Sequence, residues 1–270
     1  MHVFDVINSV ARFADGIVEG TRHPFTSVVI LAGGMGARMQ ESMGTDAGGT
    51  TKQLLDLAGE PVIIHTLRAF EASPFVDEII LVVRKEEREQ YPEMLKKAGI
   101  TKVKRIVLGG ETRQDSAFEG LLAIDDKSKF VAIHDGARPL ILPSQIEKVA
   151  REAYHMGAAA AASHAKDTVK LCDGAGYVKE TPARDSVWCV STPQIFKAEE
   201  YRAACYIGRE KKLNVTDDCM LVEDIGFPVR LVDIGYENIK ITTKEDLYFA
   251  NAILQMRKNV AKEGMIHADI

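Results

Sequence analysis

The sequence predicts an α/β protein in which helices cover both faces of a mainly parallel sheet and a β-hairpin is inserted into the domain. Three observations support this. Short apolar runs alternate with helical patterns, which is the rhythm of βαβ units. The runs are almost continuously apolar, as in strands buried on both sides. The chain has 270 residues, 46% hydrophobic and 27% charged, which is typical of a globular protein with one large domain or two small ones.

The apolar runs of the first part of the chain give five expected strands, at 28–32, 78–83, 103–108, 130–134 and 158–163. Helices are expected in the segments between them, at 62–72, 86–99, 114–124 and 143–157. In such a fold, ligands bind beyond the carboxyl ends of the strands. The residues that directly follow each strand are therefore the candidates for function.

The alternation of strands and helices breaks after Lys166. Short alternating runs flank the turn-forming segment "DGAG" at 173–176, which predicts a β-hairpin. The chain then closes with an expected strand at 229–234 and a helix for which Thr243 is a candidate N-cap.

The two ends of the chain are expected to lie outside the main domain. Residues 1–24 form an expected amphipathic helical extension, because Val3, Ile7 and Val10 recur at helical spacing. This segment lacks the basic start and continuous apolar core of a secretory signal, so it either packs on the domain surface or binds a partner. The main domain is expected over 25–258, followed by a C-terminal tail over 259–270.

Composition excludes several classes of protein. The formal net charge of −5 disfavours general nucleic-acid binding, and no apolar stretch reaches the roughly 18 residues that a membrane span requires. The four cysteines lie far apart and form no C-x-x-C pair, which argues against a zinc site and favours reduced thiols. We therefore expect a cytoplasmic protein with neither a nucleic-acid nor a membrane partner.

A burst of glycines follows the first expected strand. Gly33, Gly34 and Gly36 have no Cβ, so backbone N–H groups there can approach an anion closely. The motifs G-x-x-x-x-G-K-[ST] and G-x-G-x-x-G are both absent, which disfavours a P-loop NTPase and an NAD-dependent oxidoreductase. Arg38 and Lys52 could stabilise charge on phosphates in a transition state; the alternative is that both are solvated surface cations.

The fourth expected strand ends in "HDGARP". Asp135 is suited to hold Mg²⁺ beside phosphate oxygens, and Arg138 to hold a second anion. The alternative is a helix-capping aspartate beside a structural arginine. We expect His134 to be packed and hydrogen-bonded rather than a ligand.

Seven segments of the sequence carry a family resemblance. In chain order they are "LAGGMGARM…KQLLDLAGEPVIIHTLRAF", "GGETRQDSAFEGL", "HDGARP", "DTVK", "STPQIF", "TDDCMLVEDIGFPV" and "NIKITTKEDL". Together they resemble the 2-C-methyl-D-erythritol 4-phosphate cytidylyltransferases of the non-mevalonate isoprenoid pathway, over roughly residues 27–254. The resemblance implies a Rossmann-like nucleotidyltransferase fold, and a reaction in which CTP and a polyol phosphate give a CDP-polyol and pyrophosphate.

The resemblance also implies roles for individual residues. Those that would hold CTP are Ala32, Gly33, Gly34, Gly36, Gly110, Glu111 and Ser116. Those that would stabilise or orient the reacting phosphates are Arg38, Lys52, Arg184 and Lys240. Asp135 would bind Mg²⁺ or another divalent cation. Those that would surround the polyol phosphate are Arg138, Thr168, Thr192 and Thr216.

The inserted hairpin has a counterpart in the family. There, a β-arm reaches across a homodimer and contacts the substrate of the second subunit. In this sequence the arm would span about residues 162–188 and carry Thr168 and Arg184. The resemblance therefore implies a homodimer that forms through the β-arm.

The sequence departs from the family pattern mainly before Lys52, where "QESMGTDAGGTT" is longer than usual and ends in a threonine instead of a proline. We expect residues 40–51 to close when CTP binds. Gly136 and Ser191 stand where alanine and glutamine are usual. Two alternatives remain: a ribitol-5-phosphate cytidylyltransferase, which would share the CTP half of the site, and a homologue that binds nucleotide without turnover. The full set of cations argues against the second.

Overall fold

The structure of the protein is a computed structural model that describes residues 23–34 and 51–268, with side chains described as far as residue 260. Residues 1–22 of the expected N-terminal extension, Gly36, Arg38 and residues 40–50 of the expected closing loop lie outside the described residues.

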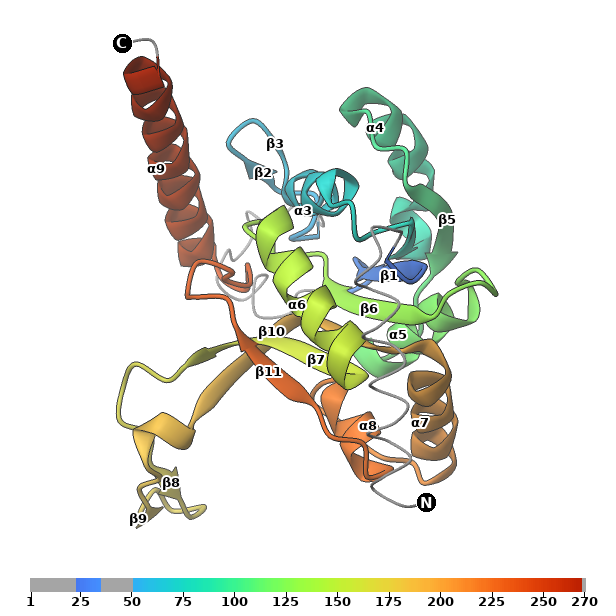
Figure 1. Ribbon diagram of the computed structural model, residues 1–270, viewed down its shortest axis with the longest axis vertical. Helices are drawn as coiled ribbons and strands as arrows, with labels where there is room; N and C mark the ends of the chain where they lie inside the picture. Colours follow the sequence, from blue (N-terminus) through green and yellow to red (C-terminus); the bar gives the residue numbers. More distant parts are fainter. Residues whose placement is uncertain (1–22, 35–50, 269–270) are drawn as a thin grey trace.

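A seven-stranded sheet forms the centre of the described part of the chain (Figure 1). In spatial order its strands are β11 (Arg230–Asp233), β7 (Ala158–His164), β10 (Trp188–Lys197), β6 (Phe130–Asp135), β1 (Thr26–Leu31), β4 (Glu78–Val83) and β5 (Val103–Leu108). All pairings within this sheet are parallel except those of β10, which runs antiparallel to β6 and β7. The predicted, mainly parallel sheet is confirmed.

β10 is a strand of the sheet that the sequence analysis did not identify. Its pairing with β7 shifts register between Val190 and Gln194, so that Ser191, Thr192 and Pro193 interrupt the pairing within a continuous strand. The residues before this interruption are mostly exposed, whereas those after it are mostly buried. Such a strand has neither a continuous apolar run nor a regular alternation, so its pattern gives no clear strand signal.

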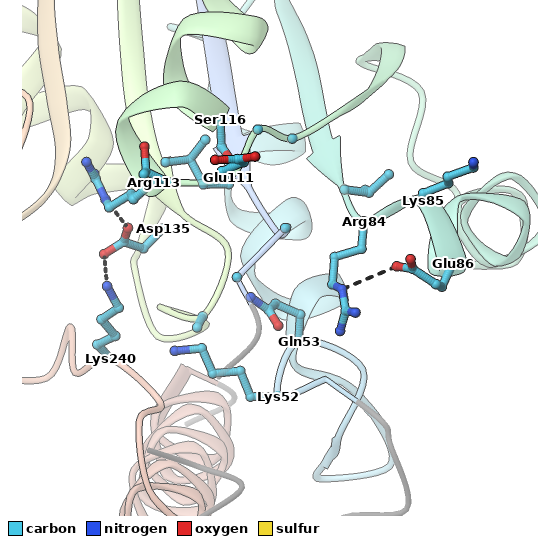
Figure 2. Close-up of a pocket in the computed structure, with 18 residues that line it drawn as sticks. Lys52, Gln53, Arg84, Lys85, Glu86, Glu111, Arg113, Ser116, Asp135 and Lys240 are labelled. Atoms are coloured by element: carbon cyan, nitrogen blue, oxygen red, sulfur yellow. Dashed lines mark hydrogen bonds and ion pairs between the residues drawn. The ribbon is translucent and has the colours of Figure 1, made fainter. Parts of the chain in front are cut away.

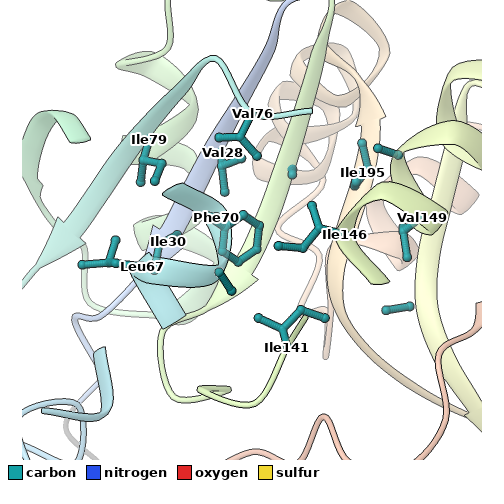
Figure 3. Packing of buried hydrophobic residues seen from close by; sticks show 14 of the residues in the cluster. Val28, Ile30, Leu67, Phe70, Val76, Ile79, Ile141, Ile146, Val149 and Ile195 are labelled. Carbon is teal, nitrogen blue, oxygen red and sulfur yellow. The ribbon is translucent and has the colours of Figure 1, made fainter. Parts of the chain in front are cut away.

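Helices cover both faces of the sheet, as predicted (Figure 1). α3 (Val62–Ala72), α4 (Tyr91–Ala98) and α6 (Pro143–Met156) pack on one face, and α5 (Arg113–Leu122), α7 (Ala198–Glu210) and α8 (Cys219–Asp224) on the other. Successive side chains of a strand point to opposite faces. In β1, Val28 therefore packs with Phe70 in the first core (Figure 3), whereas Val29 packs in the second. Because β1 is buried on both sides, the glycines that follow it start from a rigid support.

The helix expected at 86–99 consists of two elements. A 3₁₀ helix, η2, spans Lys85–Gln90, and α4 begins at Tyr91. Pro92 explains the break, because proline has no backbone N–H to donate to a preceding turn and is tolerated in the first turn of a helix. α4 ends at Ala98 and is capped by Gly99, which has a left-handed backbone with φ of 68°.

Helices α7 and α8 also lie where the sequence analysis named none. α7 buries Tyr201, Ala204, Cys205 and Gly208, which recur at helical spacing. That periodicity is the signal that was missed.

The last helix, α9 (Lys244–Ala268), begins directly after Thr243, as expected. The backbone N–H groups of Thr242 and Thr243 donate to the Asp246 carboxylate at 2.7 and 2.8 Å. The helix continues beyond residue 258, so the boundary expected there for a C-terminal tail falls inside a helix. No described helix combines the length and the apolar character that crossing a membrane requires.

The inserted hairpin projects from the sheet as an arm between β7 and β10 (Figure 1). His164 pairs with Trp188 at its base, so the arm comprises residues 165–187. Its two short strands are β8 (Leu171–Cys172) and β9 (Val178–Glu180), followed by a 3₁₀ turn, η3 (Arg184–Ser186). The Asp173 side chain accepts hydrogen bonds from the backbone of Ala175 and Tyr177, both at 2.9 Å, which closes the predicted turn.

Candidate active site

A cavity of about 610 Å³ opens at the carboxyl ends of β1, β4, β5 and β6 (Figure 2). Its lining comprises Leu31, Gly33, Gly34, Lys52, Gln53, Val83, Arg84, Lys85, Glu86, Gly109, Gly110, Glu111, Thr112, Arg113, Ser116, Asp135, Ala137 and Lys240. Each strand contributes the residues at or just after its end, where a parallel α/β sheet places its ligands.

Two backbone turns form part of the cavity wall. Gly33 and Gly34 follow β1, and Gly109 and Gly110 follow β5. A Cβ on Gly110 would lie 2.3 Å from Asp115 Cβ, so only glycine allows the chain to approach the start of α5 this closely. Ala32 lies behind this wall, fully buried, with its N–H donated to the Val82 carbonyl at 2.7 Å.

The start of α5 presents polar groups to the same cavity. Thr112 is the N-cap: its hydroxyl accepts from the Asp115 N–H at 3.0 Å, and the Asp115 carboxylate accepts from the Thr112 N–H at 3.3 Å. This capping box fixes the first turn of the helix. The first turn carries Arg113 and leads to Ser116, and both line the cavity.

Asp135, the last residue of β6, is surrounded by cations (Figure 2). Lys240 Nζ lies 2.9 Å and Arg138 Nε 3.3 Å from its Oδ2, and Arg113 Nε lies 3.2 Å from its Oδ1. Burial by itself would raise the pKa of Asp135, but the charges of Lys240, Arg113 and Arg138 outweigh it and hold the pKa well below its usual range. The carboxylate is therefore ionised at any physiological pH.

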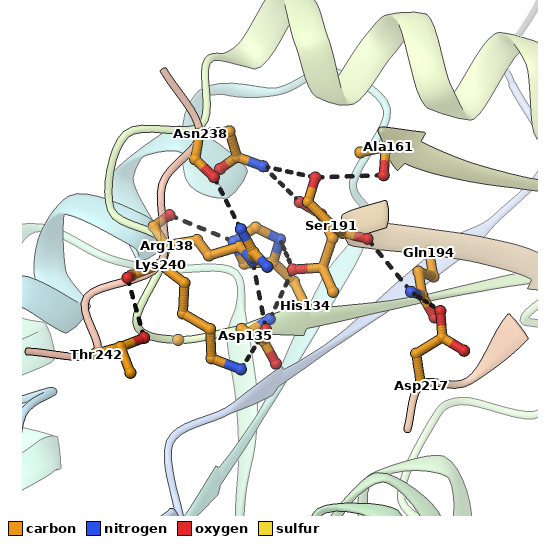
Figure 4. Close-up of polar contacts among 12 residues, drawn as sticks. His134, Asp135, Arg138, Ala161, Ser191, Gln194, Asp217, Asn238, Lys240 and Thr242 are labelled. Carbon is orange, nitrogen blue, oxygen red and sulfur yellow. Dashed lines mark hydrogen bonds and ion pairs between the residues drawn. The ribbon is translucent and has the colours of Figure 1, made fainter. Parts of the chain in front are cut away.

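A second set of hydrogen bonds holds Asp135 from behind (Figure 4). Its backbone N–H donates to the Thr192 hydroxyl at 3.0 Å, and that hydroxyl lies 3.1 Å from His134 Nδ1. The Asn238 side chain donates to the Thr192 backbone carbonyl at 2.8 Å, and the Asn238 backbone carbonyl accepts from Arg138 Nη1 at 2.9 Å. At the irregular pairing of β10 with β7, the Thr192 side chain thus contacts the end of β6.

His134 is packed and hydrogen-bonded, as expected. It is fully buried, and its ring lies 4.7 Å from that of Phe70. Burial lowers its pKa to about 3, so the imidazole is neutral at physiological pH. Two positions further on, a Cβ on Gly136 would lie 2.9 Å from the Leu31 carbonyl oxygen, so glycine allows the chain to turn tightly against β1.

Charge in the cavity favours an anionic ligand. Its lining includes five cationic side chains against three carboxylates: Lys52, Arg84, Lys85, Arg113 and Lys240 against Glu86, Glu111 and Asp135. Glu86 forms an ion pair with Arg84, which is close to it in the sequence and whose Nε lies 3.4 Å away. A concave site with excess positive charge concentrates polyanions such as a nucleoside triphosphate.

The cavity brings together part of the predicted site. Gly33, Gly34, Lys52, Gly110, Glu111, Ser116, Asp135 and Lys240 line it, and Arg138 and Thr192 contact Asp135 from outside the lining. Three predicted residues lie elsewhere. Thr168 and Arg184 contact each other on the arm at 3.4 Å, and the Thr216 hydroxyl contacts Met220 Sδ at 3.2 Å.

Several lining residues were missed by the sequence analysis. Arg113 and Gln53 both lie within quoted motifs: Gln53 directly follows Lys52, and Arg113 lies between the selected Glu111 and Ser116. Gln53 is 2% exposed, and its side-chain carbonyl oxygen has no hydrogen-bond partner among the described residues. Such a buried acceptor at a cavity wall is a signal for ligand contact that only the structure reveals.

The residues present fit a divalent cation that is held mainly by the phosphates of a bound nucleotide. The described residues include no group of three or more His, Cys, Asp or Glu side chains arranged for a metal. Mg²⁺ in nucleotide sites, however, usually binds one or two carboxylates together with substrate phosphates. Asp135 is an oxygen donor of this kind and lines the cavity.

Comparison with known proteins agrees with this geometry. A family model for 2-C-methyl-D-erythritol 4-phosphate cytidylyltransferase matches residues 26–256. Proteins of that name from Pelotomaculum thermopropionicum and Desulforamulus reducens are 45% and 44% identical to the chain; the matches cover 88% and 85% of this chain and 98% and 95% of theirs. A crystal structure of 4-diphosphocytidyl-2C-methyl-D-erythritol synthase from Anaerococcus prevotii has a TM-score of 0.76 and 34% identity, covering 90% of this chain and 99% of that one. The chain belongs to the 2-C-methyl-D-erythritol 4-phosphate cytidylyltransferase family.

Proposed function

We propose that the protein transfers the cytidylyl group of CTP to 2-C-methyl-D-erythritol 4-phosphate in the non-mevalonate pathway of isoprenoid biosynthesis. A phosphate oxygen of the polyol phosphate attacks the α-phosphorus of CTP and forms a new P–O bond. The bond from that phosphorus to the bridging oxygen breaks, and pyrophosphate leaves. The family match favours this substrate over ribitol 5-phosphate. The observation that carries the proposal is the cationic cavity at the carboxyl ends of the strands, with Asp135 at its wall.

CTP binds along the two glycine turns. The backbone after β1, at Ala32, Gly33, Gly34 and Gly36, holds the triphosphate, and Gly110, Glu111 and Ser116 hold the cytidine. The close packing of Gly110 against α5 supports this division, because it makes the second turn narrow and rigid. A base pocket built from backbone groups rejects purines by size and by unpaired polar groups.

Lys52 and Lys240 stabilise charge on the reacting phosphates, together with Arg38, which lies outside the described residues. The two lysines line the same cavity, which supports a shared role. No covalent enzyme intermediate is needed, because positioning and charge stabilisation account for catalysis of this kind of transfer. Asp135 holds Mg²⁺, which when bound neutralises charge on the phosphates.

The polyol phosphate binds beside Arg138, Thr192 and Thr216, with Thr168 and Arg184 supplied by the arm. In the described chain these two arm residues do not line the cavity. We therefore infer a homodimer in which the arm of one subunit completes the site of the other. The arm exposes 49% of Leu171, 75% of Tyr177 and 57% of Val178, and apolar surface of this kind is typical of a protein interface.

The test is pyrophosphate release with purified protein and Mg²⁺. CTP is compared with UTP, ATP and GTP, each with 2-C-methyl-D-erythritol 4-phosphate and with ribitol 5-phosphate. We expect turnover with CTP and the methylerythritol phosphate to exceed every other combination. Faster turnover with a purine nucleotide or with ribitol 5-phosphate would contradict the assignment. The same proposal places the protein in the cytoplasm, which its four free cysteines support.

A further inference from the structure

A buried polar chain connects helices α7 and α8 to Asp135. Asp218, the residue before α8, has only 1% of its side chain exposed. Its Oδ2 accepts a hydrogen bond from Arg113 Nη1 at 2.7 Å, and its Oδ1 accepts one from the Tyr201 hydroxyl at 2.6 Å. Arg113 donates from Nε to Asp135 at 3.2 Å. The chain therefore runs from Tyr201 through Asp218 and Arg113 to Asp135.

The core holds Asp218 and Tyr201 in place. Gln194 of β10 accepts from the backbone N–H groups of Asp218 and Cys219 at 3.0 and 3.2 Å, which anchors the start of α8 to the sheet. The Tyr201 ring stacks on Phe196 with its centroid 4.9 Å away. Asp218, the acceptor of Arg113, is thus anchored both to β10 and to α7.

Stability alone does not account for these buried polar groups. A buried ion pair is often no more stabilising than apolar side chains of similar volume, because both charges lose their hydration. Of the four hydrogen-bonded residues, only Arg113 and Asp135 line the cavity, and 31% of the Arg113 side chain is exposed. Two carboxylates fix this guanidinium at a wall where a polyanion would bind.

We propose that Asp218 and Tyr201 are positioning residues that hold the Arg113 guanidinium preset for the reacting phosphates, on the basis of the function proposed above. A donor that needs no reorientation stabilises developing charge better than a mobile one. Lys240, which also pairs with Asp135, has a flexible side chain of four carbons and a single point charge. Of the two cavity-lining cations that contact Asp135, Arg113 is the fixed one and Lys240 the movable one.

Two substitutions test the kinetic consequence. Tyr201→Phe keeps the ring and removes the hydroxyl, and we expect turnover to fall about tenfold, since hydrogen bonds to charged groups carry this order of effect. Asp218→Asn keeps the shape and removes the charge, and we expect turnover to fall about 10²-fold. KM for CTP should change by less than about threefold in both, because the contact matters most in the transition state.

Matched controls come from the same helices. Tyr206→Phe alters an exposed tyrosine of α7, and Asp224→Asn alters an acid of α8 that pairs with Lys211 on the surface. Both should leave turnover unchanged. If Asp218→Asn does not fold, Tyr201→Phe alone decides the kinetic test.

A direct readout comes from the Nε–H signal of Arg113 in ¹⁵N NMR, assigned by its loss in Arg113→Lys. We expect slow hydrogen exchange of this group in the wild-type protein and faster exchange in both test variants. Normal turnover in a folded Asp218→Asn protein, or reduced turnover with unchanged exchange at Arg113, would overturn the proposal. Absence of wild-type turnover would refute the proposed function instead, and the exchange measurement, which needs no substrate, would still decide the positioning role.

Discussion

The surroundings of Asp135 and the projecting arm are the two most different polar regions of the molecule. Asp135 is 7% exposed and contacts three cations and a buried threonine. On the arm, Arg184 and Thr168 are exposed, and their mutual contact is a long 3.4 Å. The first region is held by the core, whereas the second contains strands of only two and three residues.

This difference separates a region that a single chain forms on folding from a region whose contacts depend on association with another subunit. Buried charges that are paired keep one geometry, because any other arrangement would leave a charge unpaired. Exposed arm residues have no such constraint, so their side-chain positions become fixed only when they contact another surface. The surroundings of Asp135 are therefore built by folding, and we expect dimerisation to add the arm residues that complete the site for the polyol phosphate.

The largest effect is expected at the centre of the preformed half. Asp135→Asn should lower turnover by about 10²–10³-fold, as loss of one charge-stabilising group in an active site does. It should also destabilise the protein by about 3–5 kcal/mol, because Lys240, Arg138 and Arg113 each lose a buried carboxylate partner, although Arg113 keeps Asp218. Steady-state kinetics and urea unfolding measure the two effects, with the exposed Asp126→Asn as control. Near-normal turnover at limiting Mg²⁺ would show that the metal is held elsewhere.

A similar loss of activity without loss of stability is expected on the arm. Arg184→Ala should lower turnover about 10²-fold, while the free energy of unfolding stays within about 0.5 kcal/mol of wild type, as for most surface substitutions. Lys179→Ala, on the exposed strand β9, is the matched control. If Arg184→Ala keeps its activity, the arm does not take part in the site.

Mixed dimers sharpen the comparison further. A dimer with one Asp135→Asn subunit and one Arg184→Ala subunit has one site with an intact core and an intact partner arm, so it should regain about half of the wild-type turnover. Two affinity tags isolate this species from co-expressed chains. Recovery to no more than the sum of the two homodimers would mean that each arm serves its own subunit.

The smallest effect is expected from cysteine alkylation, which compares the arm and its base with the buried faces of α7 and α8. Cys172 and Cys189 are exposed, whereas Cys205 and Cys219 are buried. Burial raises the pKa of the Cys205 thiol to about 12 and that of Cys219 beyond its usual range, so both remain protonated at pH 8. Iodoacetamide followed by mass spectrometry should mark only the first two, and all four after denaturation. Rapid labelling of Cys205 in native protein would show that α7 opens.

Much of the fold was predictable because its signals are local. The apolar runs before residue 165 gave the expected strands, and each one was found within two residues of its predicted ends. The same local pattern was insufficient for β10, whose run is interrupted at Ser191–Pro193, and for the segment 86–99, where Pro92 divides one predicted helix into two elements. Propensity and periodicity describe uninterrupted elements best.

The sequence by itself determined which residues follow the buried strands, and hence that Gly33, Gly110 and Asp135 would meet at one edge of the sheet. Parallel strands place their carboxyl ends together, so chain order is enough for this inference. Only the tertiary structure decided that Asp218 holds Arg113, since 105 positions separate them and no local pattern pairs them. It also decided that Arg184, which the resemblance had placed on the arm, does not line the cavity of its own chain. Contacts between distant segments depend on how the layers pack, and packing is a property of the folded chain as a whole.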